Sequence, residues 1–213
     1  MNGSVLVTYI GHACFALEWQ GWRVVLDPYA DGSVPGLESV RETADAVYCS
    51  HDHRDHGAVK NVKRRKGQAP AGFAVEELET EHDPCGGALR GKNTVRVFTF
   101  GALRCAHLGD LGRDLTEAEC ALLRDLDLLL LPVGGYYTID AAQARVILDR
   151  LRPRVAVAMH YRTDRSGYAE IAHIDAALTR LGPAERSGAT LTLDRDTDPG
   201  LYVMQAKNEK ERD

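Results

Sequence analysis

The sequence lacks several features that would assign it to a special class of protein. Its five cysteines are scattered, odd in number and include no CxxC pair, so they do not form a disulfide framework. No apolar run approaches the ~20 residues that a membrane helix needs. The N-terminus shows no basic segment followed by an apolar stretch, as a signal peptide would. These absences predict a cytoplasmic protein with reduced thiols and no membrane partner.

A surplus of positive charge is also absent. Lys and Arg total 26 against 31 Asp and Glu, which gives a net charge of -5. Nucleic-acid-binding proteins usually carry a basic excess, whereas here only residues 60–66 are basic, and we interpret them as a solvated loop or helix end. The composition therefore argues against a nucleic-acid partner, and 213 residues suit one globular domain.

The hydrophobic pattern predicts a mixed α/β chain. Short β-branched and aromatic segments predict strands in the first half, at 5–9, 15–18, 23–26, 46–49, 72–75, 94–100 and 103–106. The second half alternates helices with two continuous apolar runs typical of buried parallel strands, 127–133 and 155–159.

Three helices are predicted between and after those runs. Two begin at capping boxes, Thr116 with Glu119 and Asp140 with Gln143. A third helix carries an apolar stripe and ends at Gly182; the stripe comprises Ile171, Ile174, Leu178 and Leu181. Final strands are expected within 190–204. The predicted organisation is one domain over 1–205 and a disordered tail over 206–213.

The strongest functional signal is SHDHRDH, residues 50–56. His51 and His53 are two positions apart, so an extended backbone would point both imidazoles to one side, about 6–7 Å apart. Asp55 and His56 follow where the chain must turn, which allows them to face a second metal. The segment directly follows an apolar strand, and this pattern favours a metal site over a charged solvated loop.

An HxHxDH motif after a strand resembles the signature of the metallo-β-lactamase superfamily, an αββα sandwich of hydrolases with one or two metals between its sheets. Further motifs match in order: TYIGHACF, LDPY, RGKNT, LPVGGYYTID and MHYRT. They resemble a short branch of bacterial metal-dependent hydrolases that is similar to ascorbate-6-phosphate lactonase. The resemblance covers roughly residues 5–180.

The resemblance implies a complete set of ligands for two metals. The first site would contain His51, His53 and His82, and the second would contain Asp55, His56 and His160. Asp110, in HLGDLG, would be shared between them. Such a set leaves open positions on each metal, which is typical of catalytic sites.

The implied activity is a hydrolase that uses a metal-bridging hydroxide on a small molecule such as a lactone, ester or phosphorylated sugar derivative. Asp55 and Asp110 would be the catalytic carboxylates. The ligands suit zinc best, although manganese or iron would also be tolerated.

Two histidines compete for the third histidine position in the set. His82 matches the family order, while His107 is the rival because it lies three residues before Asp110. His12 is either near the metals or a core histidine. Asp27 either accepts a hydrogen bond from a metal-bound imidazole or forms a turn before Pro28.

Four further residues are candidates for substrate contact. Tyr136 and Tyr137 follow a buried strand, and a hydroxyl there would stabilise an oxyanion unless the pair only packs the loop. Tyr161 and Arg162 follow His160 and are candidates for binding an anionic group, although Arg162 would equally pair with Asp164.

Two other functions stay open at this stage. Relatives with this fold cleave phosphodiesters, so a phosphodiesterase or nuclease is one alternative. A non-catalytic metal-binding scaffold is the other. The resemblance also leaves a homo-oligomer open, because small members of such folds often pair.

Overall fold

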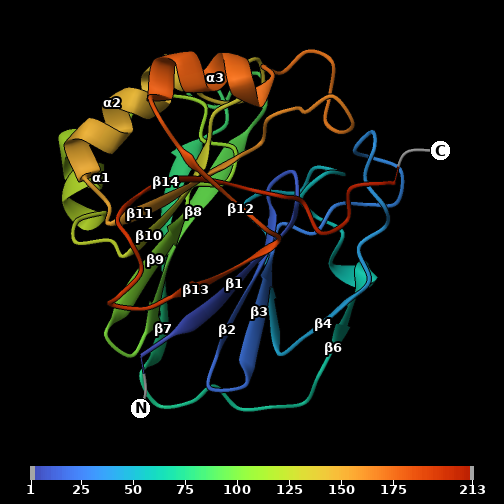
Figure 1. Ribbon diagram of the computed structural model, residues 1–213, viewed down its shortest axis with the longest axis vertical. Helices are drawn as coiled ribbons and strands as arrows, with labels where there is room; N and C mark the ends of the chain where they lie inside the picture. The colour runs from blue at the N-terminus through green and yellow to red at the C-terminus, as the bar shows by residue number, and fades with distance from the viewer. Residues whose placement is uncertain (1–2, 212–213) are drawn as a thin grey trace.

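The computed structural model describes residues 3–211 and consists of two β-sheets packed face to face (Figure 1). The smaller sheet has the order β13-β1-β2-β3-β5; its strands are β1 (Val5–Gly11), β2 (Cys14–Trp19), β3 (Trp22–Leu26), β5 (Ala46–Tyr48) and β13 (Thr190–Leu193). The larger has the order β12-β14-β11-β10-β9-β8-β7; its strands are β7 (Phe73–Glu81), β8 (Lys92–Phe100), β9 (Leu103–His107), β10 (Leu128–Pro132), β11 (Val155–Met159), β12 (Glu185–Ser187) and β14 (Gly200–Met204). The predicted α/β sandwich in a single domain is confirmed.

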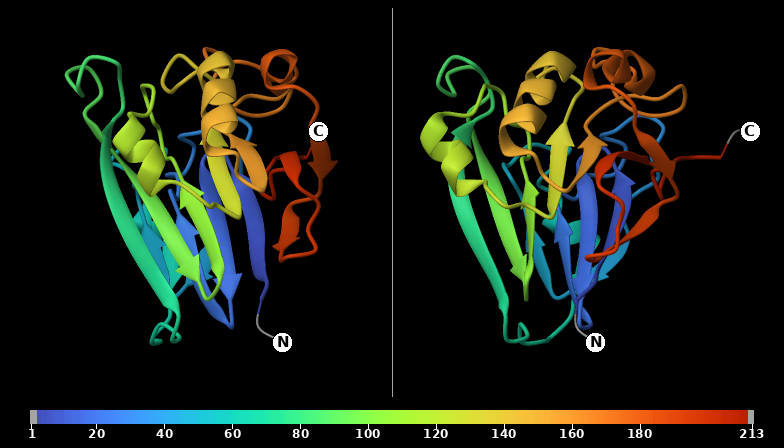
Figure 2. Two further views of the ribbon diagram at one scale, coloured as in Figure 1. Left: turned by 90° about the vertical axis from the view of Figure 1, so that its left-hand side faces the viewer. Right: turned by 60° about the vertical axis from the view of Figure 1, so that its left-hand side comes forward.

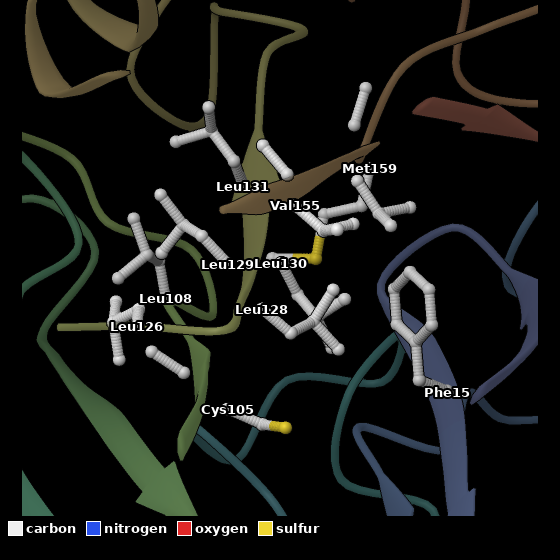
Figure 3. Close-up of a cluster of buried hydrophobic side chains, with 14 of the residues drawn as sticks. Phe15, Cys105, Leu108, Leu126, Leu128, Leu129, Leu130, Leu131, Val155 and Met159 are labelled. Atoms are coloured by element: carbon white, nitrogen blue, oxygen red, sulfur yellow. The ribbon is translucent and has the colours of Figure 1, made fainter. Parts of the chain in front are cut away.

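The main core fills the space between the two sheets. Phe15 of β2 belongs to the same buried cluster as Leu130 of β10 and Met159 of β11, and Figure 3 shows it on the strand that faces them. All five residues of β10 and all five of β11 are buried, as expected for parallel strands covered on both faces. Successive residues of a strand point to opposite faces, so Cys14 and Ala16 belong to a second, smaller core on the other side of the five-stranded sheet.

The three α-helices cover the outer face of the seven-stranded sheet (Figure 2). They are α1 (Glu117–Leu122), α2 (Ala141–Leu151) and α3 (Ile174–Leu181). Both predicted capping boxes form at the starts of α1 and α2. The outer face of the five-stranded sheet is instead covered by residues 29–40 and a two-stranded ribbon of β4 (Glu42–Ala44) and β6 (Val62–Arg64). No helix within residues 3–211 combines the length and apolar character that crossing a membrane requires.

Three local expectations differ from the structure. Ile171 does not belong to the third helix, because the His173 side chain accepts the Asp175 N–H and starts the helix there. The strands β4, β6 and β12 are too short to show a periodic pattern and were not predicted. The basic run 60–66, interpreted as a solvated loop or helix end, begins in a short 3₁₀ turn, Val59–Asn61, but continues into the strand β6.

The C-terminal segment is the larger correction. The sequence predicts disorder over 206–213, but the N–H groups of Lys207 and Asn208 donate to the carbonyls of Tyr9 and Ile10 in β1. The Glu209 carboxylate is buried and accepts hydrogen bonds from two hydroxyls of the loop after β11. The polar composition that suggested disorder therefore forms specific contacts. Residues 212–213 lie outside the described part of the chain.

Candidate metal centre

Three candidate residues follow strands that end at the same edge of the seven-stranded sheet. The strands β9, β10 and β11 are parallel neighbours. The strand β7 has the same direction, because it is antiparallel to β8, which is itself antiparallel to β9. His82 follows β7, Asp110 lies in the loop after β9, and His160 follows β11. This edge, at the carboxyl ends of the strands, is where open α/β sheets bind ligands.

The HxHxDH segment reaches the same place from the other sheet. It forms a turn after β5, in which the N–H groups of His56 and Gly57 donate to the His53 carbonyl. The expected extended backbone is not found, because the strand ends at Tyr48. The chain bends instead, and the rings of His51 and His53 are 4.5 Å apart, closer than the 6–7 Å expected along a strand.

The donor atoms of these residues gather into overlapping groups, in each of which all donors lie within 4.8 Å of one another. One group is His51, His53 and His82. A second is His12, Asp55, His56 and His160, and a third joins His51, His56 and Asp110. Every residue that the sequence placed in the two metal sites is therefore present in this cluster.

Asp110 lies between the two sides of the cluster. Its Oδ2 is 3.2 Å from Nε2 of His56, 3.3 Å from that of His160 and 3.4 Å from that of His82. It is also 4.0 Å from Nε2 of His51. One carboxylate oxygen therefore approaches imidazoles from both groups.

The structure brings His82 to the cluster and leaves His107 outside it. His107 uses both ring nitrogens elsewhere: Nε2 is 2.9 Å from the Ala13 carbonyl and Nδ1 accepts the Gly109 N–H at 3.0 Å. His12, by contrast, belongs to the cluster as a candidate metal ligand. Its Nε2 is 3.2 Å from Asp55 Oδ2, and its ring is 4.1 Å from that of His160.

Asp27 fixes the orientation of His56. Its Oδ2 is 2.8 Å from His56 Nδ1, and the carboxylate also accepts the Ser50 N–H and hydroxyl, each at 2.6 Å. When Nδ1 donates to Asp27, the lone pair of His56 Nε2, which lies 3.2 Å from Asp110 Oδ2, is left free to bind a metal. This is the outer contact that the sequence had left open against a simple turn.

Asn93 holds the loop that carries Asp110. Its amide donates to the Leu108 carbonyl at 2.9 Å, and its oxygen accepts the Asp110 N–H at 3.0 Å. Gly109 makes this packing possible, because at φ 54° a Cβ would lie only 2.4 Å from the Cβ of Ser50. A side chain at this position would push the two loops of the cluster apart.

The charge states of three histidines and of Asp110 suit a cation, whereas the carboxylates of Asp110 and Asp27 outweigh burial and raise the pKa of His56. Burial lowers the pKa of His51 to about 3 and that of His12 to about 4, and it also lowers the pKa of His82. Burial alone would raise the pKa of Asp110, but His160 and His56 hold it well below its usual range. At neutral pH the first three imidazoles are unprotonated and Asp110 is ionised, which are the forms that bind metals.

Several nitrogen and oxygen atoms that could bind a metal are buried in the cluster without any hydrogen-bond partner among the described residues. They are His51 Nε2, His56 Nε2, His82 Nδ1, Asp110 Oδ1 and both ring nitrogens of His160. A buried polar atom without a partner costs about 1–3 kcal/mol, so such a concentration is unfavourable unless something binds there. Imidazole nitrogen and carboxylate oxygen suit zinc, manganese or iron, and these residues therefore fit a metal site.

Backbone strain is concentrated at the same place. Among the non-glycine residues described, seven have positive φ, and four of these are at or beside the cluster: His12 (61°), Asp27 (44°), Tyr136 (60°) and His160 (54°). A left-handed conformation costs a residue with a side chain about 1–3 kcal/mol and persists where the surroundings impose it. The fold therefore places these side chains at an energetic cost.

The other sequence candidates divide into two kinds. Tyr161 is buried and its hydroxyl donates to the Met204 carbonyl, so it packs the core. Arg162 donates to the Ile171 carbonyl and is not paired with Asp164, which pairs with His173. Tyr136 and Tyr137 lie at the rim, where the Tyr136 side chain is 65% exposed.

Tyr168 is a site residue that the sequence did not reveal. Its hydroxyl donates to Asp55 Oδ2 at 3.3 Å, and its ring lies edge-on to His12 at 5.4 Å. It belongs to the loop between His160 and α3. Its closeness in the chain to the ligand His160 was the one feature of the sequence that could have pointed to it. Contact with Asp55, 113 residues earlier, is a property of the fold and not of the local sequence.

Comparison with known proteins places these features in a wider group. Residues 6–160 match the Beta-lactamase superfamily domain. The chain is 30% identical over 192 residues to a UPF0173 protein of Pyrococcus abyssi, which covers 77% of this chain and 87% of the relative. It is 28% identical over 225 residues to a UPF0173 metal-dependent hydrolase of Hyperthermus butylicus, covering 84% and 97%.

A solved structure agrees with these sequence matches. A Thermotoga maritima protein assigned to the metallo-beta-lactamase superfamily as a Zn-dependent hydrolase superposes with a TM-score of 0.73 at 34% identity. The match covers 94% of this chain and 98% of that one. The similarity thus extends over nearly the whole length of both chains.

Proposed function

The chain belongs to the metallo-beta-lactamase superfamily and, within it, to the UPF0173 metal-dependent hydrolases, and from this premise we propose that it hydrolyses a small-molecule ester or lactone at a two-metal centre. The observation that carries the proposal is the position of Asp110. A single carboxylate oxygen within 4.0 Å of four histidines from two donor groups is suited to joining two cations.

We assign the ligands from the donor groups. One ion would be held by His51, His53 and His82, and the other by Asp55, His56 and His160, with Asp110 shared. Zinc is the proposed metal, since imidazoles predominate in both groups. Bound divalent cations would supply a water that ionises near neutral pH and would polarise the carbonyl or phosphoryl oxygen of the substrate.

The residues of the chain itself hold this arrangement in place. Asp27 keeps His56 in one tautomer, and Asn93 fixes the loop of Asp110. Tyr168 donates to Asp55 and so restricts the rotation of that carboxylate. His53 is the exposed ligand of the first group, so substrate would enter on its side.

The substrate proposal extends to lactones, carboxylic esters and phosphorylated sugar derivatives. The net charge of -5 supports a small molecule and argues against a nucleic acid. No feature of the described residues favours a phosphodiesterase, a nuclease or a non-catalytic scaffold over the hydrolysis of these small molecules.

Asp110→Asn tests the proposal. Metal content per chain, measured by elemental mass spectrometry on protein purified without chelator, should be about two equivalents and should fall to one or fewer in the variant. Hydrolysis of a panel of lactones and esters should fall at least about a hundredfold. Asp196→Asn, an exposed change of the same kind between β13 and β14, is the matched control. Full turnover by a metal-free Asp110→Asn protein would refute the two-metal mechanism.

A further inference from the structure

The loop after His82 is folded around a buried carboxylate. Asp83 is fully buried, and its two oxygens accept four backbone N–H groups at 2.8–3.0 Å, those of Cys85, Gly87, Leu89 and Arg90. At the far end of the loop, the Gly91 carbonyl accepts the His82 N–H at 3.0 Å. The position of this loop is therefore fixed to that of a candidate metal ligand.

Arg90 is held at the rim of the metal centre by this loop. Its guanidinium carbon lies 5.6 Å from the centre of the Tyr137 ring. Within residues 3–211 no carboxylate oxygen lies within 4.0 Å of its guanidinium nitrogens. An arginine beside an active site that pairs with no acidic group is free to bind an anion.

A continuous series of aromatic contacts leads from Arg90 to the metal ligands. The rings of Tyr136 and Tyr137 are 4.7 Å apart, and those of Tyr137 and Tyr168 are 5.9 Å apart. The Tyr168 hydroxyl in turn donates to Asp55. A molecule that contacts Arg90 and these rings would therefore lie beside the atoms that carry out hydrolysis.

Two large apolar residues that adjoin Arg90 and Tyr137 in the chain, Leu89 and Tyr136, are exposed. Leu89 is 69% exposed and Tyr136 is 65% exposed, the two highest values among the exposed large hydrophobic residues. Tyr136 also has a φ of 60°, so its exposed position is maintained against backbone strain. Exposed apolar groups next to an unpaired arginine suit contact with a ligand that has both an apolar and an anionic part.

From these contacts we infer that Arg90, Tyr136 and Tyr137 form a subsite that binds a flat, negatively charged portion of the substrate. This inference rests on the proposed hydrolysis and specifies its substrate: an ester or lactone carrying a planar group with a carboxylate or phosphate. Arg90 would bind the oxyanion, and the tyrosine rings and Leu89 would contact the planar group.

A matched pair of esters tests the role of the charge. Phenyl acetate and 4-carboxyphenyl acetate differ only in the carboxylate on the leaving group. In each reaction water adds to the acyl carbon and the acyl C–O bond breaks, giving acetate, a proton and the phenol. Arg90→Met in the metal-loaded enzyme should lower kcat/KM for the charged ester about tenfold and leave the neutral ester within about twofold.

Control variants separate this effect from a general loss of charge. Arg195→Met removes an exposed arginine between β13 and β14 and should leave kcat/KM unchanged for both aryl esters. Tyr136→Ala should lower kcat/KM for both aryl esters about fivefold and leave ethyl acetate unchanged. Equal losses for both aryl esters in Arg90→Met, or no loss for either, would overturn the assignment.

Binding of the product provides a readout that does not depend on turnover. Binding of 4-hydroxybenzoate to the metal-loaded protein is followed by ligand-observed NMR. We expect the Kd to rise about tenfold in Arg90→Met. If no ester is hydrolysed but this binding depends on Arg90, the proposed reaction fails and the subsite stands. If esters are hydrolysed and 4-hydroxybenzoate binds equally well to both proteins, the reaction stands and the subsite fails.

Discussion

Asp27 shows at the scale of one residue how the metal centre depends on a group outside the donor set. It is almost completely buried and accepts three hydrogen bonds, two from Ser50 and one from His56. Its pKa is held at about 2: burial opposes this, but His56 and His107 outweigh it, so the carboxylate stays ionised through the neutral range.

Asp27→Asn should therefore weaken metal binding. The amide nitrogen would face a donor where an oxygen now accepts, so His56 would lose its fixed orientation. We expect metal affinity to fall about 10- to 100-fold, measured by competition with a chromogenic chelator. Asp31→Asn, which changes an exposed aspartate paired with Arg41, is the control. Unchanged affinity in Asp27→Asn would show that the His56 contact has no orienting role.

The sequence revealed the donor residues better than the residues that orient them. His51, His53, Asp55 and His56 are adjacent in the chain, so their motif is local. The membership of His12 and Tyr168 depends on contacts with Asp55 across 43 and 113 residues, which no local pattern encodes. The sequence favoured His82 over His107 as the third histidine ligand, and the structure agrees, because both ring nitrogens of His107 are engaged outside the cluster.

At the scale of one element, α1 is held by a charged network as well as by its cap. Glu119 accepts hydrogen bonds from both terminal nitrogens of Arg113, at 2.7 and 2.8 Å, and from the Thr116 N–H at 2.7 Å. Arg113 also pairs with Glu81, the residue before His82. The hydrogen bonds from Arg113 lower the pKa of Glu119 to about 2. Because Arg113 contacts both Glu119 and Glu81, it connects the start of α1 to the strand end beside His82.

The pH dependence of stability follows from this pKa. Because the pKa of Glu119 is lower in the folded chain than the usual ~4.3, its charge stabilises the fold above about pH 4. That contribution is lost as the pH falls from about 4 toward 2. Glu119→Gln, which retains an oxygen for the cap, should cost about 2 kcal/mol at pH 7 and progressively less below about pH 4.

Urea unfolding at several pH values measures this difference in unfolding free energy. Glu117→Gln is the matched control, because the side chain of Glu117 is 92% exposed and should contribute at most about 0.5 kcal/mol. A Glu119→Gln deficit that does not change between neutral and acid pH would contradict the argument.

Element prediction succeeded where a local rule applied and failed where tertiary contacts decided. The capping boxes at Thr116 and Asp140 placed two helix starts correctly, because the reciprocal bonds involve residues three positions apart. The apolar stripe placed Ile171 in the third helix, but a histidine side chain begins that helix, which is an uncommon cap. Ile171 is buried by the fold around it and not by helical periodicity.

At the scale of the whole molecule, the C-terminal segment joins distant parts of the chain. Glu209 accepts hydrogen bonds from Thr163 and Ser166 at 2.8 and 2.9 Å and pairs with Arg165. The Lys210 N–H donates to the Gly36 carbonyl. The segment therefore connects the loop that carries Tyr168 to the covering layer of the five-stranded sheet.

Glu209→Ala should destabilise this connection. Two hydroxyls and a guanidinium would lose their acceptor, which we expect to cost about 2–3 kcal/mol of unfolding free energy. Hydrogen exchange should become faster in residues 161–171, measured by mass spectrometry, while β10 stays protected. Glu211→Ala, two residues later and exposed, is the control. Unchanged exchange in the Tyr168 loop would show that the segment does not restrain it.

The pairing of β1 with β13 has a consequence for biosynthesis. All seven proposed ligands have been translated once residue 160 is made, but the strand that completes the five-stranded sheet begins at Thr190. A nascent chain that ends between residues 160 and 190 thus contains all of these histidines and carboxylates, while one edge of β1 is still unpaired. The sheet that supports the HxHxDH turn therefore gains its last strand only after all seven proposed ligands have been made.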